Sequence, residues 1–337
     1  MNISIFDKNH KMRRLLFFLI ISFVVTYCGR KKTTEAGNQT IVVSKTIKPP
    51  AFSADSAYFF IQQQLHYGPR VPNSKGHKQC GDYLIAQFKA YNAQVVVQSF
   101  QGITFTNETL HLRNIIASYN TSKEKRIILA AHWDTRPFAD KDEKDKNKPI
   151  DGANDGGSGV AVLLEIARIL STQADRFPTG IDIILFDGED YGPLHDQSID
   201  SEAMYWCLGS QYWAKNKHQT NYGAYYGILL DMVGARDATF LQEAYSLHYA
   251  GEIVKKVWNT AEQLGYGAYF SSQNSGGGIQ DDHVAVNEIA AIPMIDIVDD
   301  FSSKAYHHTH LDQLDIIDHR TLQAVGETIL YVIINEN

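Results

Sequence analysis

Apolar runs alternate with segments of helical periodicity along most of the chain. The most informative run is Ile181–Phe186, which is apolar at five of its six positions, as expected of a strand that is covered on both faces. Strands that alternate with helices in this way predict an α/β fold, a three-layer sandwich whose central sheet is mixed, mostly parallel and flanked by helices. The predicted strands are Ala93–Phe100, Leu110–Tyr119, Arg126–Ala131, Ile181–Phe186, Tyr226–Leu230 and Ile292–Val298, the first two as an antiparallel pair at the sheet edge.

Segments with one apolar face predict the helices that cover this sheet. They are Asp55–His66, Gly76–Ala90, Val160–Leu170, Leu241–Leu264 and Arg320–Ile334, with a short helix that begins near Asp282. The glycine- and serine-rich segment Ser271–Gly278 is predicted to be a loop. Because no second linker and no repeat follows Ala54, we expect residues 54–337 to form a single domain.

The N-terminal region has a different pattern. The basic segment Lys11–Arg14 precedes the apolar run Leu15–Val25, which is typical of a secretory signal and is shorter than the ~20 residues of a spanning helix. Val25–Cys28 resembles a bacterial lipobox, which predicts membrane attachment through a lipidated Cys28. Since Tyr27 is bulkier than the residue usual before that cysteine, a periplasmic protein without an anchor is the alternative. We therefore expect residues 1–28 to be a signal peptide and the protein to be exported to the cell envelope.

Composition and charge narrow the classes of function. Residues 29–50 are polar and end in two prolines, which predicts a tether over residues 29–53. A formal net charge of −7, with no basic stripe outside the leader region, argues against a nucleic-acid partner. Export would leave Cys80 and Cys207 in an oxidising context, but two cysteines so far apart do not imply a disulfide.

The strongest chemical signal follows the central strand. Glu189 and Asp190 come directly after it, in the segment Asp187–Asp190. Carboxylates crowded at the end of a buried strand repel one another unless a cation or a shared proton holds them, and ligands bind at this edge of α/β sheets. We expect one of the two side chains to handle a proton and the other a metal; a solvated acidic turn is the alternative.

Other strands and one helix deliver similar residues to the same edge. His132, Asp231 and the pair His307 and His308 follow predicted strands, and Asp155 precedes a helix. Alone, each has a simpler explanation, such as a loop hydrogen bond for His132 or a helix N-cap for Asp155. Their convergence favours one site, and histidines with carboxylates form the ligand set of a catalytic Zn²⁺.

Taken together, these motifs resemble the zinc aminopeptidases of metallopeptidase family 28, and within them the glutaminyl-peptide cyclotransferases. The resemblance covers the chain from Ala54 to the C-terminus. It rests on these segments: His132–Asp134, Gly152–Gly159, Phe186–Asp190, Asp231 and His308–Asp312 for the superfamily, and Gly68–Pro72, Cys207–Trp213 and Gln280–His283 for the cyclases.

The resemblance implies a zinc-aminopeptidase-like fold and assigns roles to individual residues. It implies that Asp155, Asp190 and His308 bind one Zn²⁺ and that Glu189 is the general acid and base. Asp231 and Asp281 would share a hydrogen-bond network with Glu189. His132 and Asp231 match positions that hold a second zinc in the peptidases.

Two positions depart from the family pattern. His307 stands where the animal cyclases have a tryptophan, so Trp206, Trp213 or His307 itself would have to contact the substrate. Asp190 replaces the commoner glutamate ligand, which shortens its reach by one methylene.

The resemblance implies cyclisation of the N-terminal Gln of peptides or proteins to pyroglutamate, with release of ammonia. The alternative is an aminopeptidase that holds two zincs and hydrolyses the first peptide bond. A catalytically inactive binding protein is a third hypothesis, against which the intact Glu189 argues.

Overall fold

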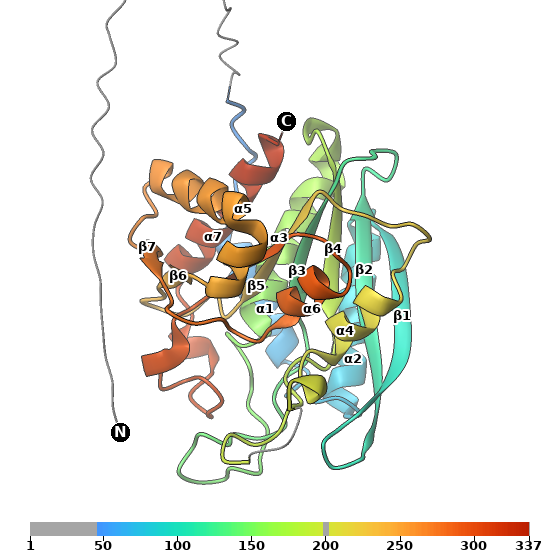
Figure 1. Ribbon diagram of the computed structural model, residues 1–337, viewed down its shortest axis with the longest axis vertical. Helices are drawn as coiled ribbons and strands as arrows, with labels where there is room; N and C mark the ends of the chain where they lie inside the picture. Colours follow the sequence, from blue (N-terminus) through green and yellow to red (C-terminus); the bar gives the residue numbers. More distant parts are fainter. Residues whose placement is uncertain (1–45, 198–201, 337) are drawn as a thin grey trace, which may run out of the picture. The chain divides into compact units, whose positions relative to one another are not determined.

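Six strands form the central sheet in the computed structural model (Figure 1). Their order is β1-β2-β4-β3-β5-β8. The outer pairs β1·β2 and β2·β4 are antiparallel, whereas β4, β3, β5 and β8 run parallel. The strands are β1 (Gln94–Ile103), β2 (Thr109–Tyr119), β3 (Arg126–His132), β4 (Gly180–Phe186), β5 (Tyr226–Asp231) and β8 (Met294–Val298). The predicted mixed, mostly parallel sheet with an antiparallel edge pair is confirmed.

The structure describes residues 46–197 and 202–336. The predicted signal peptide, Cys28 and most of the predicted tether therefore lie outside the described residues. None of the helices in the described ranges is long and apolar enough to cross a membrane.

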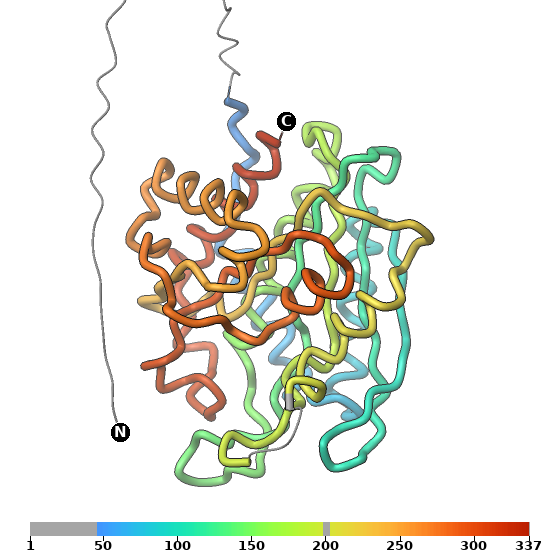
Figure 2. The backbone as a smooth tube through the Cα atoms, in the orientation of Figure 1, coloured from blue at the N-terminus to red at the C-terminus, as the bar shows by residue number. Residues whose placement is uncertain are grey.

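Helices cover both faces of the sheet (Figures 1 and 2). The larger core lies under α1, α2, α3, α5 and α7, and a second core lies under α4 and α6. Strands β3, β4 and β5 are buried at every residue, which explains their nearly continuous apolar sequence. The helices are α1 (Ala54–Leu65), α2 (Lys75–Ala90), α3 (Gly157–Gln173), α4 (Leu208–Lys215), α5 (Ala244–Gln263), α6 (Asp282–Glu288) and α7 (His319–Ile334).

The tether that was predicted for residues 29–53 is shorter than expected. Phe52 is buried in the main core, Ser53 caps α1, and the backbone of Ile47 exchanges two hydrogen bonds with the side chain of Asn335. A segment that buries an aromatic ring and pairs its backbone belongs to the fold, so the domain begins near residue 46.

A second, two-stranded sheet was not predicted. Strands β6 (Phe240–Gln242) and β7 (Phe270–Asn274) pair in parallel beside α5. The helix predicted from Leu241 starts only after Glu243, whose carboxylate accepts hydrogen bonds from the amides of Tyr245 and Ser246. Part of the predicted loop Ser271–Gly278 is therefore strand, because its backbone pairs with β6.

Candidate active site

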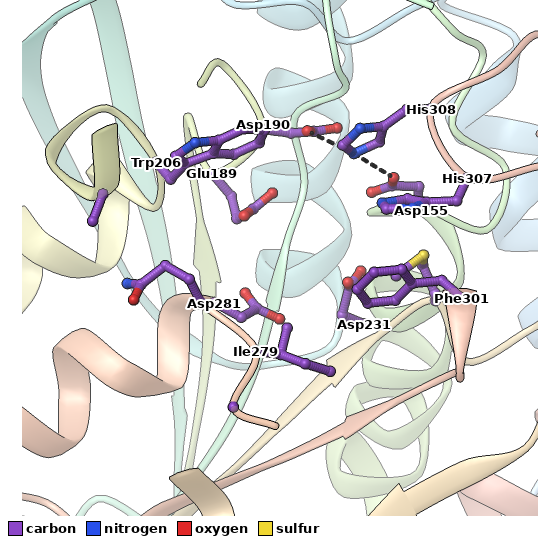
Figure 3. A pocket seen from close by; sticks show the side chains of 14 residues that line it. Asp155, Glu189, Asp190, Trp206, Asp231, Ile279, Asp281, Phe301, His307 and His308 are labelled. Atoms are coloured by element: carbon purple, nitrogen blue, oxygen red, sulfur yellow. Dashed lines mark ion pairs between the residues drawn. The ribbon is translucent and has the colours of Figure 1, made fainter. Parts of the chain in front are cut away.

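The carboxyl ends of the parallel strands open into a pocket of about 410 Å³ (Figure 3). The pocket combines acidic residues with histidines and aromatic rings, and it brings together all but two of the predicted site residues. His132 lies just behind it, fully buried, and Trp213 lies elsewhere. Its lining includes Asp155, Glu189, Asp190, Trp206, Asp231, Asp281, His307 and His308.

His308 lies within 4 Å of each of the other two predicted zinc ligands. His308 Nε2 lies 3.3 Å from Asp190 Oδ1 and 3.8 Å from Asp155 Oδ2, and all three side chains are buried (Figure 3). Burial and the nearby charge of Asp155 raise the pKa of Asp190 well above its usual range. Asp190 Oδ2 has no hydrogen-bond partner among the described residues. Two oxygens and one imidazole nitrogen with an unsatisfied carboxylate atom suit a bound cation, and this donor set suits zinc.

Buried aspartates hold the backbone that carries these ligands. Asp134 accepts hydrogen bonds from the amides of Glu189 (3.1 Å) and Asp190 (3.2 Å). Asp312 accepts hydrogen bonds from the amides of Asn154 (2.7 Å) and Asp155 (3.0 Å). Each ligand loop is thus fixed by a carboxylate from a distant part of the chain.

Gly156 directs Asp155 into the pocket. Its φ of +74° lies in the left-handed region, and a Cβ atom there would approach Asp134 O to 2.7 Å and His132 Cε1 to 2.9 Å, so only glycine fits. Gly156 is also the N-cap residue of α3, which has no side-chain cap. The simpler explanation of Asp155 as a helix cap is therefore wrong.

His132 joins a second set of possible ligands. Its Nε2 atom lies 3.1 Å from both Asp155 Oδ1 and Asp231 Oδ1. Burial opposes a charge on His132, but the neighbouring carboxylates of Asp134, Asp155 and Asp231 raise its pKa well above 6.5. Burial raises the pKa of Asp231 to about 7, although His132 acts in the opposite direction. His132 can therefore carry a proton at this position, or join Asp155 and Asp231 around a second cation.

Glu189 lies beside the three predicted zinc ligands. Burial raises its pKa well above 4.5; His132 opposes this, and Asp190 and Asp281 add to it. Its carboxylate, the thiol of Cys207 and Asp281 offer atoms that all lie within 4.8 Å of one another. A carboxyl group with a raised pKa can both accept and release a proton near neutral pH.

The aromatic residues divide between the pocket and the core. Trp206 lines the pocket, and its ring is parallel to that of His308, with centroids 6.2 Å apart. His307 also lines it, against Phe301. Trp213 is fully buried, donates to His218 Nδ1 and packs on Phe186 in the second core. The predicted contact of Trp213 with substrate is therefore wrong, because the inner face of α4 turns it into the core.

Sequence reasoning missed several residues around the pocket. Phe301 and Ile279 contribute apolar walls. Arg136 lies 4.8 Å from the centre of the Trp206 ring and makes a long contact of 3.5 Å with Asp190. Phe301, Ile279 and Arg136 lie on loops, where the sequence has no hydrophobic periodicity. Only the Gln280–His283 motif, which follows Ile279, indicated that this part of the chain lies near the site. Cys80 and Cys207 are both free and buried in the described residues.

The family model for peptidase family M28 matches residues 114–333. The chain therefore belongs to peptidase family M28, a class that the mixed sheet and the cluster of histidines and carboxylates at its edge already suggested.

Within that family, solved structures of glutaminyl cyclases are similar to this chain. The Bacteroides thetaiotaomicron glutaminyl cyclase bound to N-acetylhistamine is 47% identical with a TM-score of 0.83, over 86% of this chain and 100% of that one. The Tannerella forsythia glutaminyl cyclase is 48% identical with a TM-score of 0.81, over 86% and 100%. A Zn-dependent exopeptidase from Parabacteroides distasonis is also 48% identical, with a TM-score of 0.82 over 85% and 99%.

Proposed function

We propose that this protein is a glutaminyl-peptide cyclotransferase, which converts the N-terminal Gln of peptides or proteins to pyroglutamate. The observation that carries the proposal is the position of Glu189, a mostly buried carboxyl group with a raised pKa beside Asp155, Asp190 and His308. Such a site supports several reactions, and the similarity to glutaminyl cyclases favours cyclisation.

Asp155, Asp190 and His308 would hold one Zn²⁺. Zinc would act as a Lewis acid toward the γ-carboxamide of the substrate. The Zn-dependent exopeptidase among the similar structures supports this choice of metal. We expect one zinc ion per chain.

Glu189 would move the protons of the reaction. It accepts a proton from the α-amine, whose nitrogen then bonds to the carbonyl carbon of the γ-carboxamide. The bond from that carbon to the amide nitrogen breaks, and Glu189 returns the proton to the departing ammonia. Because both reacting groups belong to one residue, the pocket has only to hold the correct rotamer, and Trp206 offers a flat wall for its aliphatic part.

Asp231 and Asp281 would support Glu189 in these steps. Burial raises the pKa of both groups, so each can carry a proton that it shares within the acidic cluster. They keep the pocket from accumulating several unpaired negative charges.

Mass spectrometry of a peptide substrate tests this proposal. A peptide that begins with Gln should lose one ammonia and become resistant to N-terminal sequencing. The control is the same peptide with Leu in first position, which should remain intact. Release of free leucine, with no change in the Gln peptide, would contradict the proposal.

An aminopeptidase is the second candidate, because His132, Asp155 and Asp231 form another set of donors within 4.8 Å of one another. If all three bound a second zinc, a hydrolytic reaction would be favoured. Metal analysis of the fully active protein separates the two: one zinc per chain is expected for the cyclase and two for the aminopeptidase.

The proposal also includes export and attachment to a membrane through a lipidated Cys28, outside the described residues. Fractionation of cells that express the full chain tests it. Wild type should be found with the membranes and the Cys28→Ala variant should not.

A further inference from the structure

Lys141 reaches His307 from the loop that follows β3. Its Nζ atom lies 2.7 Å from His307 Nδ1. His307 is almost fully buried, and its ring is held between Phe301, at a centroid distance of 4.3 Å, and His308, at 3.9 Å. The ring therefore has one orientation, in which one nitrogen faces a lysine and the edge of the ring enters the pocket (Figure 3).

This contact determines where the imidazole carries its proton. A lysine ammonium has three donors and no acceptor, so Nδ1 must accept and the neutral ring must carry its hydrogen on Nε2. An Nε2 atom that bears hydrogen cannot bind a metal. The Lys141 contact thus disfavours His307 as a metal ligand, although a ring nitrogen of His307 lies within 4.8 Å of Asp155 and His308 ligand atoms.

The Nε2–H group is left without a protein acceptor. None of the described residues hydrogen-bonds to it, and His307 makes no ion pair with Asp155 within 4.0 Å. A donor of fixed orientation that faces a pocket and has no partner in the protein is suited to an acceptor on the ligand.

We propose that His307 Nε2–H donates a hydrogen bond to a carbonyl oxygen of the peptide substrate, and that Lys141 is the positioning residue that fixes the tautomer required. The inference rests on the proposed function for the identity of the substrate. It gives the pocket a polar contact with the substrate at the position where the animal cyclases have a tryptophan.

The backbone of Lys141 has a separate role. Its amide donates to His308 O at 3.3 Å, which supports the left-handed conformation of His308, with φ of +58°. A change of the Lys141 side chain leaves this amide in place. Effects on the tautomer can therefore be separated from effects on the zinc ligand.

The test compares Lys141→Met with Lys148→Met in the zinc-loaded protein. Lys148 is an exposed lysine of the same loop and serves as the matched control. ¹⁵N spectra of the histidine rings should show the Nε2–H tautomer of His307 in wild type and Lys148→Met, and a mixture of tautomers in Lys141→Met. The signal is assigned by its absence in His307→Gln. Zinc content should be equal in all variants.

Kinetics with a Gln-initiated peptide test the contact with substrate. Loss of one neutral hydrogen bond should raise KM about tenfold in His307→Phe, with kcat much less affected. The rise should be smaller in Lys141→Met, because part of its His307 keeps the required tautomer. His307→Gln keeps an N–H donor and should recover part of the affinity. The Lys148→Met variant should match wild type.

Two results would overturn the inference: an Nδ1–H tautomer or an imidazolium for His307 in wild type, or an unchanged KM in both Lys141→Met and His307→Phe. Failure of the proposed function looks different, because wild type would then form no pyroglutamate. In that case the proposed contact with substrate would be wrong as well. The tautomer of His307 is measured without substrate and would still decide the role of Lys141.

Discussion

Glu189→Gln separates the catalytic role of this side chain from its cost to the fold. The amide has nearly the same shape as the carboxyl group but cannot take up or release the proton of the reaction. General acid and base catalysis typically contributes about 10²- to 10⁴-fold, so we expect kcat to fall by that factor. KM should change little, because Trp206 and the other walls of the pocket are unaltered.

The same substitution should have the opposite effect on stability. Burial raises the pKa of Glu189 well above 4.5, so the folded protein holds the ionised form less readily than the unfolded chain does. Such a group destabilises the fold above the unfolded-state pKa and has no effect below it. The metal-free variant should therefore unfold at an equal or higher urea concentration than wild type at pH 7, and at the same concentration near pH 4.

Three measurements check this prediction: ammonia release, zinc content and urea unfolding at the two pH values. Glu124→Gln, at an exposed residue of the turn between β2 and β3, is the matched control and should behave as wild type. The reasoning would be refuted by a Glu189→Gln variant that retains more than about a tenth of wild-type kcat. Loss of zinc from the variant would show instead that Glu189 is a ligand.

Three further predictions concern the walls, the acid stability and the metal. Trp206→Ala should raise KM with little change in Tm, whereas Trp213→Ala should cost about 3–5 kcal/mol of stability with KM unchanged, as seen from paired kinetics and thermal unfolding. Burial favours the neutral form of Glu243, but hydrogen bonds from His283 and from backbone amides lower its pKa from 4.5 to about 2. The stability that this carboxylate contributes should be full above pH 4.5 and should be lost as the pH falls toward 2. Urea titrations should show a weaker dependence of the unfolding free energy on pH in this range for Glu243→Gln. Chelation of the metal should lower Tm and added Zn²⁺ should restore it, whereas an unchanged Tm would contradict binding at Asp155, Asp190 and His308.

The sheet could be predicted from the sequence because its strands are buried on both faces. Ile181–Phe186 and Arg126–Ala131 are apolar at almost every position, and β4 and β3 include them. The small β6·β7 sheet could not be predicted, since the polar residues of β7 pair through their backbone and four of the five are not buried.

The gathering of Asp155, Glu189, Asp190, Asp231 and His308 in one pocket could also be predicted. Parallel strands end at the same edge of the sheet, so residues that directly follow different strands lie close together there. Trp213 was misplaced because an aromatic residue near a motif could face either way, and only the packing of α4 decides it. Lys141 and Arg136 gave no signal, because their loop has no periodicity and its position depends on contacts with His308 and Asp190.

The carboxylates of Asp134 and Asp312 make the two ligand loops depend on distant parts of the chain. Asp134 is joined to the loop that carries Asp190 across 56 residues, and Asp312 is joined to Asp155 across 157 residues. A chain that is still being synthesised, or one truncated before Asp312, lacks the group that sets the first ligand loop, even though Asp155 and Asp190 are already present. Zinc binding should therefore require a chain that includes Asp312. A fragment that ends shortly before Asp312 should retain zinc no better than a much shorter fragment.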